Sequence, residues 1–269
     1  MEVLFILKLD TPKEHFVVVY NKDFEETNEK HLTAMDAYVY ITMKLMAGNA
    51  YVNDTLYATA DAICSFSFTQ PASNLSRKFV KELQLSLERI SKNGYIPRKL
   101  NIENNPFPHI YNIANARSKD WSISSNWKGE PYTLIPISSY NKILAIFDCS
   151  EIMKIRLLYF YIKLTSMIGY KTGICTYSID VISEKTGLSV VTVQDYIRTL
   201  ENHEVLTVYH MGKNIYGHAN YPTNVIGQYY NRDKVLQYGK DVFESYCIKY
   251  KLNSHGRKKY EEDDQQTSA

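Results

Sequence analysis

The chain has 269 residues, with 31 Lys or Arg against 29 Asp or Glu, so its formal net charge is +2. This length suffices for one large or two small domains with a buried core. The near balance of charges excludes an overall polycation, so a nucleic-acid site would have to arise from local clustering of cations. Hydrophobic residues make up 45% and charged residues 22% of the chain, which excludes a mostly disordered protein.

The cysteines and the apolar segments exclude further classes. The four cysteines, at 64, 149, 175 and 247, contain no C-x-x-C pair, so we expect neither a zinc site nor a disulfide framework. The first ten residues lack the basic region of an export signal. No apolar stretch approaches the roughly 18 residues that a membrane span needs. We therefore expect a cytoplasmic protein with no membrane partner, no metal and no cofactor.

The first half of the chain predicts a hairpin and then three helices. Two β-rich runs, 2–9 and 16–20, flank a turn signal and predict the hairpin. Thr33 and Asp36 form a capping box that begins a helix ending at 48–49. A second helix is predicted at 55–66, and a long third helix from Ser73 to Asn93-Gly94. Three β-like pieces follow, at 109–116, 121–127 and 132–138.

The second half predicts the same order again. A helix at 151–168 precedes a short helix at 179–186, which Ser178 caps. After a turn at Gly187, Ser189 caps a helix that extends to about residue 203. The remaining predicted elements are two strands at 205–209 and 215–221 around a tip at 211–214, a helix at 231–250 and a polar tail.

Helices followed by paired strands, occurring twice, predict an α+β chain with two winged helix-turn-helix units in tandem after an N-terminal β-hairpin. The expected divisions are 1–30 for the hairpin and its connection, 31–140 and 141–250 for the two winged-helix domains, and 251–269 for a disordered tail.

The most specific motif is the segment 182–206. Val193, Ile197 and Leu200 recur at the spacing of a buried helical face. After the cap residue Ser189, the leading and outer positions are Val190, Val191, Thr192, Gln194, Asp195 and Arg198, where a recognition helix faces the major groove. The segment resembles the winged helix-turn-helix of replication initiators and regulators of Gram-positive plasmids and phages. Winged helices also act as dimerisation modules, and residues 175–203 carry a net charge of −2, which favours that alternative.

Phosphate contacts near this motif would come from Lys185, and from Lys213 and Asn214 at the predicted tip. The first unit has the opposite charge, because residues 73–99 hold seven cations against two carboxylates. Its candidate DNA-binding residues share the leading turns of the predicted third helix: Ser73, Asn74, Arg77, Lys78 and Lys81. An ordinary solvated helix face is the alternative.

A basic and aromatic segment at 117–128, ending in Lys128, predicts a wing that contacts phosphate or the minor groove, with aromatic packing between domains as the alternative.

Catalytic motifs are missing from the sequence. No phosphate-binding G-x-x-x-x-G-K-[ST], G-x-G-x-x-G or H-E-x-x-H occurs, and no His-x-His pair accompanies the many tyrosines. We expect a protein that is not an enzyme. The resemblance implies a sequence-specific double-stranded DNA-binding protein of a mobile element, namely a replication initiator that binds repeated origin sites, self-associates on DNA and contacts host replication proteins. The alternatives are a transcriptional or conjugation regulator and, in another class, a protein-interaction scaffold such as a helicase-loading factor.

Overall fold

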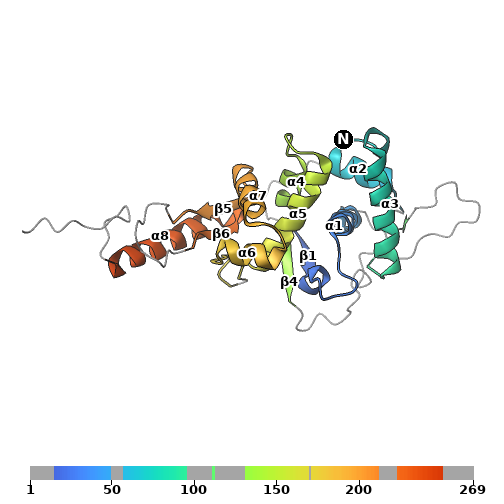
Figure 1. Ribbon diagram of the computed structural model, residues 1–269. Coiled ribbons are helices and arrows are strands. Elements are labelled where there is room, and N and C mark those ends of the chain that lie inside the picture. Colours follow the sequence, from blue (N-terminus) through green and yellow to red (C-terminus); the bar gives the residue numbers. More distant parts are fainter. Residues whose placement is uncertain are drawn as a thin grey trace, which may run out of the picture. The chain divides into compact units, whose positions relative to one another are not determined.

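The computed structural model describes residues 15–49, 57–95, 111–112, 131–169, 171–211 and 223–250. The chain divides into two compact units, residues 1–166 and 167–269 (Figure 1). The predicted α+β class is confirmed, since helices predominate over three two-stranded antiparallel sheets in the described ranges. None of the described helices combines the length and the apolar character needed to cross a bilayer.

Unit 1 is built around helix α1 (Ala34–Asn49), which packs against α2 (Ala60–Phe68), α3 (Arg77–Lys92) and α5 (Glu151–Ser166). The remaining helix, α4 (Ile137–Leu144), packs on α5. Strand β1 (Phe16–Tyr20) pairs with β4 (Tyr132–Pro136), and β2 (Tyr57–Ala58) pairs with β3 (Tyr111–Asn112). Two short 3-10 turns, η1 (Asn21–Phe24) and η2 (Ala72–Asn74), complete the unit's described elements.

Large aromatic side chains fill much of the core of unit 1. Tyr38, Tyr40, Tyr140 and Tyr161 are among its largest fully buried side chains. The Tyr140 hydroxyl lies 2.6 Å from the Thr42 hydroxyl, so this polar end is satisfied inside the core. The high tyrosine content of the sequence is therefore partly structural.

Strand β1 has a partner that the sequence did not predict. Val18 lies opposite Leu134, so β1 pairs with a strand more than a hundred residues later. The predicted partner, 2–9, lies outside the described residues, as do 121–127 and most of 109–116. Residues 137–138, expected at the end of a strand, instead begin α4, which periodicity did not predict.

The starts of two helices also differ from the prediction. The second begins at Ala60, because the Thr59 hydroxyl accepts a hydrogen bond from the Ala62 N–H and the preceding residues pair with β3. The third begins at Arg77 rather than Ser73, because the Ser76 hydroxyl caps it by accepting from the Phe79 N–H at 3.2 Å. The predicted ends of α1 and α3 are confirmed.

Unit 2 contains α6 (Ile179–Thr186), α7 (Val190–Asn202), β5 (Leu206–Tyr209), β6 (Val225–Gln228), η5 (Tyr229–Asn231) and α8 (Arg232–Lys249). Helix α8 packs on β5 and β6 around an apolar cluster that includes Ile174, Met211 and Val235. Cys175 joins β6 as an isolated bridge, since it exchanges backbone hydrogen bonds of 2.7 and 2.9 Å with Ile226.

The strand after β5 begins later than predicted. Tyr209 lies opposite Val225, so β5 pairs with 225–228 and not with a strand at 215–221 around a tight tip at 211–214. Residues 212–222 lie outside the described part of the chain. The division between the units falls after α5, whereas the sequence places it after residue 140, because α5 packs on α1, α4 and β4.

Helix α8 passes close to Tyr209 of β5 at Gly239. An added Cβ there would lie 2.2 Å from Cγ and 2.5 Å from Cβ of Tyr209, near the main chain, where the side chain cannot swing away. We expect Gly239→Ala to lower the free energy of unfolding by about 1–3 kcal/mol despite the better helix propensity of alanine. Urea unfolding measures this loss; stability equal to that of the exposed control Lys240→Ala would contradict the tight packing.

Buried titratable groups of unit 1 predict how stability depends on pH. Burial lowers the pKa of Lys44 from 10.5 to about 8, although nearby Asp23 opposes the shift. Because the unfolded chain binds this proton more tightly, stability should rise as the pH increases above about 8. Burial raises the pKa of Tyr140 and Tyr159 to about 12, so stability should fall again above about pH 10, where unfolded tyrosines ionise.

The expected maximum therefore lies between about pH 8 and 10. Chemical unfolding at a series of pH values measures it. Lys44→Met should remove the rise below the maximum, while the exposed control Lys30→Met should keep it. A free energy of unfolding that falls steadily as the pH rises from 7 would contradict the effect assigned to Lys44.

Candidate nucleic-acid interface

The turn between α2 and α3 presents polar side chains from a fixed backbone. Asp61, in the first turn of α2, accepts a hydrogen bond of 2.9 Å from the Ala72 N–H through its Oδ1. This bond ties η2 to the start of α2 and leaves Ser73 and Asn74 exposed in front of α3. Both predicted residues thus lie before the helix and not in its leading turns. The sequence analysis did not identify Asp61, whose partner is a backbone N–H eleven residues away.

The first turns of α3 carry three exposed cations, Arg77, Lys78 and Lys81. The opposite face of the helix is buried at Phe79, Leu83, Leu87 and Ile90. Arg77, Lys78 and Lys81 form no ion pair with another described residue. Their charges are therefore available to phosphates, and they follow Ser73 and Asn74 by a few residues along the chain.

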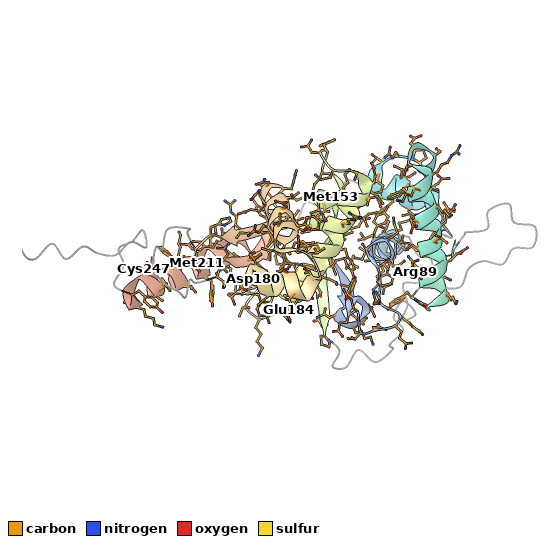
Figure 2. The ribbon with its side chains drawn as sticks, in the orientation of Figure 1. Arg89, Met153, Asp180, Glu184, Met211 and Cys247 are labelled. Atoms are coloured by element: carbon orange, nitrogen blue, oxygen red, sulfur yellow. The ribbon has the colours of Figure 1, made fainter. Side chains whose placement is uncertain are left out.

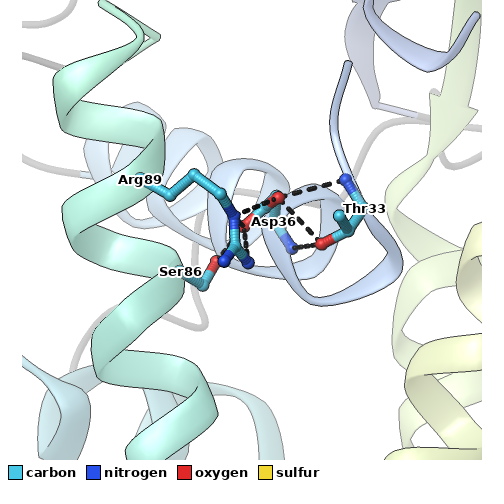
Figure 3. Close-up of polar contacts among 4 residues, drawn as sticks. All are labelled: Thr33, Asp36, Ser86 and Arg89. Atoms are coloured by element: carbon cyan, nitrogen blue, oxygen red, sulfur yellow. Dashed lines mark hydrogen bonds and ion pairs between the residues drawn. The ribbon is translucent and has the colours of Figure 1, made fainter. Parts of the chain in front are cut away.

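Another cation of α3, Arg89, is not available to phosphates. Arg89 donates from Nη2 to Asp36 Oδ1 at 2.7 Å and from Nε to Oδ2 at 2.9 Å (Figure 3). Asp36 is 1% exposed and also accepts hydrogen bonds from the Ser86 hydroxyl at 2.7 Å and from the Thr33 hydroxyl at 2.8 Å. The hydrogen bonds to Asp36 raise the pKa of Arg89. Arg89 therefore joins α3 to the start of α1, and the positive surface of α3 is smaller than its sequence suggests.

The predicted helix-turn-helix of unit 2 has the expected local structure. The Ser178 hydroxyl caps α6 by accepting from the Val181 N–H at 3.3 Å, and α6 ends at Gly187, whose φ is +71°. That left-handed conformation favours glycine.

The turn and the start of α7 are held by two serines. The Ser183 hydroxyl donates to the Leu188 carbonyl at 2.5 Å, and the Ser189 hydroxyl caps α7 by accepting from the Thr192 N–H at 3.2 Å. The predicted caps and turn are confirmed.

The exposed side of α7 carries four of the predicted outer residues, Val191, Gln194, Asp195 and Arg198. Val193, Ile197 and Leu200 are buried as predicted, and so is Tyr196. Arg198 Nη1 lies 3.6 Å from Asp195 Oδ1, and both side chains are more than half exposed. This pairing lowers the attraction of Arg198 for phosphate but adds little stability.

Two other predicted residues make local contacts. The half-buried Thr192 hydroxyl lies 2.8 Å from that of Ser189, so both belong to the cap of α7. Lys185 Nζ lies over the Tyr177 ring, 5.6 Å from its centroid. Asp180 and Glu184, both labelled in Figure 2, lie on α6. Lys185 lies on the same helix, which therefore carries a net negative charge.

The structure therefore brings the candidates together in two groups, one on each unit. Lys128, Lys213 and Asn214 lie outside the described residues. In the described ranges no group of three or more His, Cys, Asp or Glu is arranged to hold a metal ion. No family model, curated protein or solved structure matches this chain.

Proposed function

We propose that the chain is a sequence-specific double-stranded DNA-binding protein built from two winged helices. The observation that supports this most is a shared order of elements. Along unit 1, α1 is followed by the short strand β2, by α2 and α3, and by β3, which pairs back onto β2. Further along the chain, α5 is followed by the extended residue Cys175, by α6 and α7, and by β5 and β6. Strand β6 pairs with β5 and also back onto Cys175, so this second series has one strand more than the first. This is the order of helices and strands in a winged helix.

The two groups of candidate residues support different roles in binding. The cations at the start of α3 suit phosphates, whose contacts give affinity without sequence information. The exposed stripe of α7 is close to neutral, because Arg198 and Asp195 offset each other, so it offers side chains for base edges instead. Together the units would combine affinity from α3 with sequence selectivity from α7.

Within DNA binding we favour a cytoplasmic replication initiator of a mobile element that self-associates on repeated origin sites and recruits host replication proteins. Two units on neighbouring sites raise each other's effective concentration, which suits repeats. A regulator of transcription or conjugation is the second candidate, and a protein-interaction scaffold is the candidate from another class. The proposed activity is binding without catalysis.

Selection of duplexes from a random pool and from plasmid DNA by the full chain distinguishes these functions. Enrichment of repeats beside an origin supports initiation, and enrichment of a single promoter site supports regulation. Lack of enrichment at any salt concentration would contradict sequence-specific binding and leave the scaffold.

Catalysis has its own test, in which supercoiled DNA is incubated with the full chain and magnesium, with and without ATP. We expect neither nicking nor ATP hydrolysis. Either activity, if abolished by a single tyrosine or carboxylate substitution, would contradict the proposal.

A further inference from the structure

The first turn of α7 exposes an apolar side chain where a solvated helix would carry a polar one. Val191 is 66% exposed, more than most of the other exposed large hydrophobic residues in the described ranges. It precedes Gln194 and Asp195 by three and four residues, and Arg198 by seven, so the four side chains share one stripe of the helix. The stripe thus begins with a methyl-bearing side chain and continues with an amide.

The charges of the stripe disfavour a role in binding the phosphate backbone. Asp195 repels phosphate and lies 3.6 Å from Arg198, which reduces the attraction that Arg198 exerts. The base edges of the major groove are the alternative target, and they offer different partners to different side chains. An apolar side chain contacts the C5-methyl group of thymine, and a glutamine binds adenine by donating to N7 and accepting from the N6 amino group.

The amide of Gln194 is available to form both of these hydrogen bonds with adenine. It is exposed, and its amide forms no hydrogen bond with another described residue. Thr192 is less suited to base reading, because its hydroxyl lies 2.8 Å from that of Ser189. Both Val191 and Gln194 therefore point to the same kind of base pair.

We infer that α7 reads A·T base pairs in the major groove, with Val191 against a thymine methyl group and Gln194 on an adenine edge. This inference rests on the proposed function and specifies the sequence class that the second unit recognises. The cations of α3 then contact the phosphates, and the uncharged side chains of α7 contact the bases.

The experiment uses the full chain and the duplex that it selects from a random pool. In a series of duplexes, deoxyuridine replaces thymidine at one A·T pair at a time, which removes one methyl group from the DNA. At the pair that Val191 contacts, we expect the wild-type affinity to fall about fourfold, the amount expected for one buried methyl group. Val191→Ser, which leaves no methyl group at this position, should bind the thymine and uracil duplexes equally. Ile248→Ser, which also replaces an exposed apolar side chain by serine but on α8, should keep the fourfold difference.

A second substitution in the DNA tests Gln194. Replacing the contacted adenine by 7-deazaadenine removes N7 and should weaken wild-type binding about tenfold, whereas Gln194→Ala should lose this sensitivity. A selected site without A·T pairs, or a methyl effect that persists in Val191→Ser, would overturn the inference while leaving DNA binding intact. Failure of the wild-type chain to bind any duplex would overturn the proposed function and this inference with it.

Discussion

Replacing Asp36 by Asn is expected to lower the free energy of unfolding by about 3 kcal/mol, since one partner of a buried ion pair is removed. The Asp36 carboxylate is 1% exposed and accepts hydrogen bonds from Thr33, Ser86 and Arg89. An asparagine amide group would face these donors with its own N–H donors and would remove the carboxylate that is hydrogen-bonded to the Arg89 guanidinium. The 40% exposure of the Arg89 side chain places the effect at the lower end of the range for buried pairs.

Urea unfolding of the full chain measures this effect, with the exposed Glu82→Gln on α3 as a control that also removes one carboxylate. The control should stay within about 0.5 kcal/mol of the wild type. In an Arg89→Ala background, Asp36→Asn should cost less, because the two residues are coupled. Equal stability of Asp36→Asn and Glu82→Gln would contradict the role given to this ion pair.

The second large effect concerns DNA affinity. Arg77→Ala combined with Lys81→Ala removes two of the three exposed cations at the start of α3, so binding to all duplexes should weaken. If each cation contacts one phosphate, the slope of log K against log salt should change from about −2.7 to about −0.9. Fluorescence anisotropy with the selected duplex and with random duplexes measures both slopes.

Gln194→Ala on α7 is the matched comparison, because it removes a polar group without removing charge. It should keep the salt slope and reduce discrimination between sequences by about 1–3 kcal/mol. Thr192→Ala should have a smaller effect on discrimination, since its hydroxyl lies 2.8 Å from that of Ser189. Equal losses on all sequences from the α3 and α7 variants would show that α7 does not read bases.

The sequence correctly predicted the helix ends that are set by contacts between residues close together in the chain. The capping box of Thr33 and Asp36 begins α1, and Ser178, Gly187 and Ser189 define α6, α7 and the turn between them. Each of these contacts joins residues three to four positions apart, so the sequence shows both partners together. The exposed stripe of α7 was predictable for the same reason.

Contacts between distant residues were not predictable. The pairing of β1 with β4 and the bond from Arg89 to Asp36, 53 residues apart, depend on how helices pack. For this reason the charge count of residues 73–99 includes Arg89, although its guanidinium is paired with Asp36. The start of α3 was wrong because Ser73 and Ser76 both suit a helix cap, and the bond from the Ala72 N–H to Asp61 favours a separate turn before Ser76.

The most direct test of the account is the affinity of the full chain for a random-sequence duplex, measured by fluorescence anisotropy between 50 and 200 mM salt. Three phosphate contacts from the start of α3 give a slope of about −2.7, which corresponds to about a fortyfold loss of affinity over this range. A loss of this size, with tighter binding to a selected duplex throughout, is the predicted result. An affinity that does not change with salt, or the absence of binding at 50 mM salt, would contradict DNA binding through these cations.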